Sequence, residues 1–270
     1  MAKKKEVKSG WKRKFFEAFN FISDSKKYVF FIIFLFVLSG VLGFIFSDRL
    51  GFLDEMLEKI VKQIEGKDTL EIIFLIFFNN VRSALFGLIW GIFFAVIPLI
   101  NTLSNGAVIG YVFSKVVALQ GVSSLWRILP HGIFELPAIF IALGLGTRWG
   151  AETLIHFFRT NKKDRGKKIS GVIVSILFIV SFILIFYIGN IINLKGVQGV
   201  DMSIKIALIF LFFMFLILAI LFFFLFVFGR GVREMQVAMI KKLIIVFFMV
   251  VLPLLVIAAI IEGVLVRLSV

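Results

Sequence analysis

The chain has 270 residues, of which 61% are hydrophobic and only 17% are charged, and its mean hydropathy is +1.08. Soluble domains are about 45–50% apolar, so this chain has too few charged residues to cover a soluble globule of its size. These numbers exclude the soluble, disordered and fibrous classes and leave an integral membrane protein. The chain has no cysteine, which excludes disulfides, thiolate metal sites and cysteine nucleophiles.

Seven apolar segments follow one another along the chain and predict an all-α, polytopic transmembrane helical bundle. The block 72–100 would be about 43 Å long as one helix, against a hydrocarbon core of about 30 Å, so it must tilt, break or protrude. Asn105-Gly106 is a helix-stop signal, and a broken helix or tight turn is expected near 101–106. Broken or re-entrant helices are therefore expected between residues 72 and 145. The segments are 28–46, 72–100, 105–119, 128–145, 169–192, 204–228 and 243–266.

The net charge of +14 is distributed in a way that orients these segments. Residues 1–27, 148–168 and 229–242 carry net charges of +6, +5 and +3, whereas residues 47–71 carry −3. The positive-inside rule places the three basic segments in the cytoplasm and the acidic one outside. An odd number of crossings must then separate 47–71 from 148–168, which gives five or seven spans, a cytoplasmic N-terminus and an external C-terminus. Topology accounts for the basic charge, so no nucleic-acid partner is expected.

Two segments outside the spans have the pattern of amphipathic helices. In the basic tail 1–27, Trp11, Phe15, Phe19 and Ile22 fall at helical spacing among lysines and arginines, which suits a helix on an anionic cytoplasmic leaflet. In the external loop 47–71, an apolar stripe runs along one face of a helix that could lie on the membrane, cap the bundle or contact a partner. The remainder, 28–270, is expected to be a single transmembrane domain. The stripe consists of Phe52, Leu53, Met56, Leu57, Ile60, Val61 and Ile64.

Polar residues inside the apolar segments are costly, so their positions are informative. Asn79 and Asn80 are adjacent and project from different faces of a helix. Small residues four apart, as at Gly106 and Gly110, allow helices to approach closely. Arg82 could snorkel or pair with Glu135 or Glu262. The full constellation, structural or ligand-binding, is Asn79, Asn80, Arg82, Asn105, Gly106, Gly110, His131, Gly132, Glu135 and Glu262.

The most distinctive string is LPHGIFELPA at 129–138. Pro130 suits the first turn of a helix, which puts His131 and Glu135 at positions i and i+4 on one face. Pro137 removes a backbone donor one turn later. The His–Glu pair is either a structural link or a functional site. The chain has only two histidines, so no metal site is expected, and neither a strained Gly-x-Ser-x-Gly turn nor a P-loop is present.

These residues resemble the signature of the stage II sporulation protein M family of integral membrane proteins. The resemblance rests on LPHGIFELPA, on Asn79-Asn80, on Asn105-Gly106 followed by Gly110, and on Ala-Ala-x-x-Glu at 258–262. It implies no catalytic activity. In spore formers the founding member works with two peptidoglycan-cleaving partners at the septal membrane, but the family is much wider and includes archaeal proteins, so a sporulation role is not carried over.

The resemblance and the residues together lead to a non-enzymatic, multi-pass cell-membrane protein that anchors or assembles envelope or membrane-remodelling partners. Its expected partners are the lipid bilayer, membrane or envelope proteins and a possible second copy, and no cofactor is expected. The alternative is a transporter or lipid permease with a polar site of Asn79, Asn80, Asn105, His131 and Glu135. An intramembrane enzyme with His131 and Glu135 as acid and base is a third, weaker reading.

Overall fold

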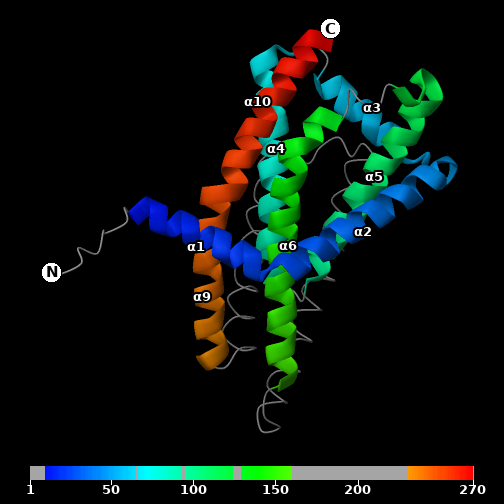
Figure 1. Ribbon diagram of the computed structural model, residues 1–270. Coiled ribbons are helices and arrows are strands. Elements are labelled where there is room, and N and C mark those ends of the chain that lie inside the picture. The colour runs from blue at the N-terminus through cyan, green and yellow to red at the C-terminus, as the bar shows by residue number, and fades with distance from the viewer. Residues whose placement is uncertain (1–9, 65, 93–94, 124–128, 160–229, 270) are drawn as a thin grey trace, which may run out of the picture. The chain divides into compact units, whose positions relative to one another are not determined.

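The computed structural model describes residues 10–64, 66–92, 95–123, 129–159 and 230–269, and the predicted spans 169–192 and 204–228 lie outside them. Contacts divide the chain into two units, Met1–Leu154 with Met239–Val270, and Ile155–Ala238. In the second unit the structure describes only the end of one helix and the beginning of another. Every regular element among the described residues is a helix, as predicted (Figure 1).

The chain begins with two helices that meet at Ser25. Helix α1, Gly10–Asp24, is the predicted amphipathic helix, and α2, Lys26–Ile45, matches the first predicted span. A short turn of 3-10 helix, Ser47–Leu50, leads to α3, Leu53–Ile64, in the predicted external loop. Helix α4, Thr69–Ile89, follows with a capping box at its start. There the backbone N–H of Glu71 donates to the Asp68 carboxylate (2.8 Å), and that of Asp68 donates to Glu71 (3.0 Å).

The apolar block 72–100 is broken, as expected. The prediction of a break near 101–106 is wrong. The interruption comes earlier, where α4 passes into a 3-10 turn, Trp90–Ile92, and Ala95 adopts a left-handed conformation (φ +66°). Helix α5, Val96–Gln120, then runs without interruption through Asn105-Gly106. The Asn105 side-chain amide donates to the Asn101 carbonyl within the helix (3.0 Å), so it stays compatible with helical backbone instead of ending it.

The remaining described helices include the signature string and the last span. Helix α6, Leu129–Arg159, has Pro130 in its first turn and Pro137 inside it, as predicted. Helix α9, Arg230–Val246, continues through a π-helical turn, Phe247–Val251, into α10, Leu252–Ser269. Five helical stretches among the described residues are long and apolar enough to cross a membrane. They are Lys26–Ile45, Thr69–Ile92, Val96–Gln120, Gly132–His156 and Glu234–Ile261.

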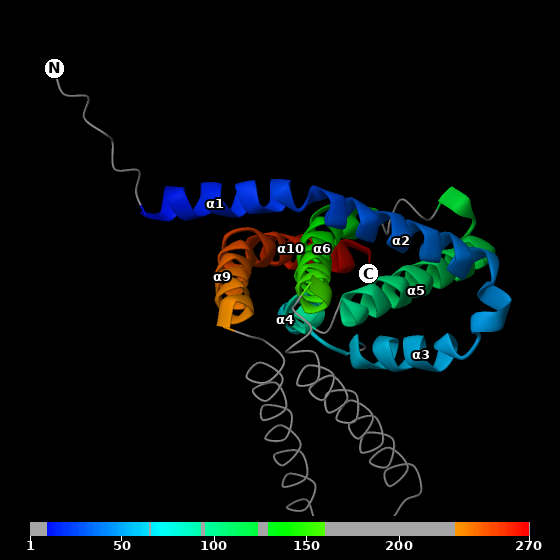
Figure 2. The same ribbon diagram turned by 90° about the horizontal axis from the view of Figure 1, so that it is seen from below.

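Helices α2 and α5 cross at a contact made by glycines, and they lie side by side in both views (Figures 1 and 2). A Cβ atom on Gly110 would lie 1.9 Å from the Gly40 carbonyl oxygen, and one on Gly43 would lie 2.3 Å from that of Ala107. Gly106 faces Ser39 and the Phe36 carbonyl. The predicted small-residue spacing therefore brings two backbones together, as in close-packed membrane helices.

A second glycine contact joins α4 to α6. A Cβ on Gly91 would lie 2.2 Å from the Gly146 carbonyl oxygen, and one on Gly146 would lie 2.3 Å from that of Gly87. A Cβ on Gly150 would lie 2.0 Å from the Ala95 nitrogen, where the chain turns from α4 into α5. Helix α10 packs along α4 on another side. The two crossings explain how a bundle with few polar contacts fixes the spacing of its helices.

Candidate functional site

The polar constellation includes a hydrogen bond between α6, which contains the string LPHGIFELPA, and α4. Asn80 of α4 is 7% exposed and is a hydrogen-bond partner of the Glu135 carboxylate on α6, with the amide as donor. A carboxylate placed among apolar helices needs such a donor, because an unpaired buried charge is expensive. The chemistry of the link is simple, because one amide on α4 donates to one acid on α6.

The same face of α4 makes a second link, to α5. The Asn101 amide donates to the Ser83 hydroxyl (3.5 Å), and the Asn105 amide donates to the side-chain oxygen of Asn101 one turn later. Helix α4 thus carries two polar contacts three residues apart, Asn80 toward α6 and Ser83 toward α5. Asparagine amides can link neighbouring membrane helices in this way.

Other predicted residues lie away from this set of links. Asn79 and Arg82 are both exposed, so the adjacent asparagines do point to different environments, as their spacing predicts. Glu135 takes its described hydrogen bond from Asn80 and not from Arg82. Gly106 and Gly110 belong to the α2–α5 crossing, whereas a Cβ on Gly132 would meet only Leu136 of its own helix. The side chains of His131 and Glu262 lie outside the described residues, and so do the pairings predicted for them.

Sequence reasoning missed a cluster that ties α3 to α5. The Tyr111 hydroxyl donates to the Asp54 carboxylate (2.5 Å), and the Lys115 ammonium lies 3.4 Å from its other oxygen. Tyr111 itself is fully buried. The hydrogen bond from Tyr111 holds the pKa of Asp54 below its usual value, and Lys115 lowers it further, against the opposing effect of desolvation. A tyrosine one helical turn before a lysine in an apolar segment was the available signal.

A second missed cluster ties α1 to α6 and the last span. Arg148, counted in the sequence as part of a basic loop, donates from Nη1 to the Ser25 hydroxyl (2.7 Å) and from Nε to Glu152 (2.7 Å). Its guanidinium lies 4.6 Å from the centre of the Phe21 ring, and the Lys242 ammonium lies 5.2 Å from the same centre. Two cations on one aromatic ring hold the end of α1 against the bundle.

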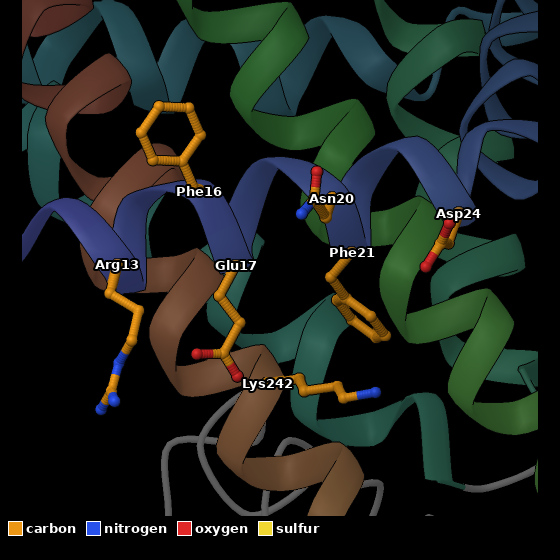
Figure 3. Close-up of a pocket in the computed structure, with 7 residues that line it drawn as sticks. All are labelled: Arg13, Phe16, Glu17, Asn20, Phe21, Asp24 and Lys242. Atoms are coloured by element: carbon orange, nitrogen blue, oxygen red, sulfur yellow. The ribbon is translucent and has the colours of Figure 1, made fainter. Parts of the chain in front are cut away.

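A pocket of about 440 Å³ opens beside this second cluster, between α1 and Lys242 (Figure 3). Arg13, Glu17 and Asp24 point from α1 to the side on which Lys242 lies, while Phe16 points to the other side. Phe21 and Asn20 complete the lining. The pocket holds charges of both signs. No group of three or more His, Asp and Glu side chains within the described parts of the chain is placed to hold a metal ion.

Comparisons with known proteins identify the family. The family model described as "Stage II sporulation protein M" matches residues 30–192. The chain belongs to this family. An uncharacterized protein of the archaeon Methanocaldococcus jannaschii is 29% identical over 133 residues, which cover 45% of this chain and 58% of that protein. The chain thus aligns with little more than half of this relative's length. No solved structure matches the chain significantly.

Membership of the stage II sporulation protein M family confirms the resemblance drawn from the sequence. The matched region contains α4, α5 and α6, and with them the Asn80–Glu135 link, the Asn101–Ser83 link and both glycine crossings. Helix α1 and the whole of the described last span lie outside it. The polar links thus belong to the part of the chain that the family shares. The contacts of Arg148 join that part to α1, which lies beyond it.

Proposed function

We propose that this member of the stage II sporulation protein M family is a non-enzymatic, multi-pass cell-membrane protein that anchors or assembles envelope or membrane-remodelling partners. The bundle supplies the membrane anchor, and a surface helix supplies the partner contact. Family membership supports the membrane anchor. The partner contact is argued from one observation, the way in which α3 is attached.

Helix α3 is attached firmly at its beginning while part of its apolar stripe is uncovered. Leu53 is buried, and Asp54 is held by Tyr111 and Lys115 of α5. Phe52 and Met56, from the same stripe, remain 71% and 39% exposed. The opposite face carries a solvent-exposed ion pair between Lys62 and Glu58 (2.7 Å). An apolar surface on a fixed helix outside the spans is the kind of surface that a protein partner covers.

The experiment is site-specific photo-crosslinking in the membranes of the protein's own host. A photoreactive phenylalanine analogue at position 52 is expected to capture one recurring envelope or membrane-remodelling protein. The same analogue at position 58, on the polar face, serves as the matched control and should capture much less of it. Co-purification in mild detergent then measures how much of that partner remains bound to the unlabelled protein.

The variant Phe52→Asp decides between recruitment and simple packing. It should abolish co-purification of the captured partner while leaving the amount and thermal stability of the protein unchanged, because Phe52 is already exposed in the folded chain. Repeated recovery of the intact protein alone, with equal crosslinking at both positions, would contradict the proposed role. A crosslink between two copies of the chain would replace the envelope partner by a homo-oligomer.

A further inference from the structure

The end of helix α1 contacts charged residues next to two of the predicted spans. Its Phe21 ring contacts Arg148 and Lys242. These two residues lie just beyond the ends of the predicted spans 128–145 and 243–266, on the side that the positive-inside rule assigns to the cytoplasm. Lys26 and Lys27 begin the first span directly after α1. Charged residues of three membrane-spanning stretches thus surround the end of α1, and they mark the depth of the membrane surface.

The aromatic residues of α1 form an exposed row. Trp11 stacks on Phe15 with ring centres 5.6 Å apart, and Phe15 contacts Phe19 at 4.8 Å. Trp11 and Phe19 are 62% and 49% exposed, although a soluble helix would cover such side chains. Tryptophan and phenylalanine are the residues that interfacial helices place at the boundary between headgroups and acyl chains. We call Trp11, Phe15 and Phe19 the aromatic row.

The charges of α1 are sorted around this row. Lys12 and Lys14 flank it by helical position, while both acids, Glu17 and Asp24, lie on the opposite face with Arg13, where the pocket opens toward Lys242 (Figure 3). Lys242 marks the cytoplasmic end of the last span, so the acidic face turns toward the cytoplasm. The aromatic row lies on the side of α1 away from these acids, with a lysine at each of its edges.

We propose that α1 is a fixed arm whose aromatic row inserts into the cytoplasmic leaflet and whose Lys12 and Lys14 bind anionic lipid headgroups. The arm is fixed because Ser25 accepts a hydrogen bond from Arg148 and donates one to the Phe21 carbonyl (2.6 Å). The bundle therefore holds the last turn of α1, while contact with the lipid sets how deeply the aromatic row inserts. The occupant of the exposed face is the lipid surface, since the charge at its edges complements anionic phosphates.

The absence of cysteine allows single labels to be placed without background. Spin labels are placed on Phe19→Cys and Asn20→Cys in the full-length protein, reconstituted in vesicles of phosphatidylcholine and phosphatidylglycerol. They compare a position in the aromatic row with the next position, which lines the pocket. The label at 19 is expected to collide mainly with oxygen, which concentrates in the bilayer, and the label at 20 mainly with a water-soluble nickel chelate. Equal exposure of both labels to the chelate would overturn the insertion.

The lipid preference is tested by matched charge variants carrying the label at position 19. At about 1 kcal/mol per lysine near an anionic surface, Lys12→Gln with Lys14→Gln should weaken insertion roughly 30-fold. Arg13→Gln removes the same kind of charge from the opposite face and should leave insertion unchanged. Insertion that is equal in pure phosphatidylcholine and in the anionic vesicles, or equally weakened by both variants, would overturn the headgroup contact. An unchanged thermal unfolding midpoint shows that each variant is folded.

Discussion

The two amphipathic helices on either side of α2 are attached at the end nearest to it, but by different chemistry. Helix α1 is held at its last turn by a permanent cation, Arg148, and by aromatic contact. Helix α3 is held at its first turn by the Asp54 carboxylate, which titrates. Helix α1 should therefore keep its attachment across the ordinary pH range, whereas the attachment of α3 depends on an ionised group.

The largest loss of stability is expected at the contact between α2 and α5, because α2 connects the two amphipathic helices. Gly110→Val would place a Cβ 1.9 Å from the Gly40 carbonyl oxygen, which is backbone and cannot rotate away. Separating α2 from α5 should cost about 3 kcal/mol and loosen both amphipathic helices together. Denaturant titration of the purified protein in detergent measures the loss. Gly51→Ala, where a Cβ would meet nothing within 4 Å, is the control and should be neutral.

The second-largest loss of stability is expected from a variant that loosens the attachment of α1 and leaves that of α3 intact. Arg148→Met leaves Glu152 without its ion pair and removes a cation from Phe21, so a loss of about 2–3 kcal/mol is expected. Spin labels should show α1 becoming mobile while a label on α3 is unchanged. Arg13→Met, an exposed arginine of α1, is the control. Equal mobilisation of both helices would show that the attachments are not independent.

The third-largest loss of stability is expected from a variant of the α4–α6 link, which should leave the attachments of both α1 and α3 intact. Glu135→Leu leaves the Asn80 amide without its described acceptor in an apolar setting, at an expected cost of about 2 kcal/mol. Thermal unfolding in detergent should move to lower temperature, with unchanged label mobility on α1 and α3. Glu135→Gln, which keeps an acceptor, should recover much of the loss. Unchanged stability in Glu135→Leu would remove the α4–α6 link as a stabilising contact.

The smallest loss of stability is expected from a variant that tests whether the attachment of α3 depends on pH. Because the pKa of Asp54 is lowered in the folded protein, its contribution is present above the ordinary carboxyl pKa and is lost as pH falls through the lowered value. Asp54→Asn should therefore reduce the thermal unfolding midpoint at neutral pH and match the wild type in strong acid. Glu58→Gln, on the exposed face of α3, is the control. A difference independent of pH would contradict the ionic attachment.

Much of the fold could be predicted because membrane helices obey strong constraints of length and polarity. The span 28–46 lies within one residue or two of α2, and Gly106 with Gly110 predicted a close crossing. The position of the break could not be predicted, because the local signal at Asn105-Gly106 is overridden by an intrahelical bond from Asn105. Ala95, where the chain does turn, carries no local sign of a left-handed residue.

The candidate site was predicted by residue type more than by partner. Asn80 and Glu135 were both named in the predicted polar constellation, but the sequence did not single out their contact with each other. Arg148 was read as part of a charged loop because a net-charge count does not show that its guanidinium reaches Ser25, which precedes it by more than a hundred residues. Partners so distant in sequence depend on how helices pack, and no local pattern contains that information.

The π-helical turn at Phe247–Val251 changes the rotation of the residues that follow it in the last span. A π turn uses more residues for each rotation than an α turn does, so the residues after it are shifted in phase. This shift keeps buried residues before the turn, such as Leu243, on nearly the same side as Ala258 and Ala259 beyond it. A residue lost within the turn would be absorbed, because the turn would then become α-helical and α10 would keep its face toward α4.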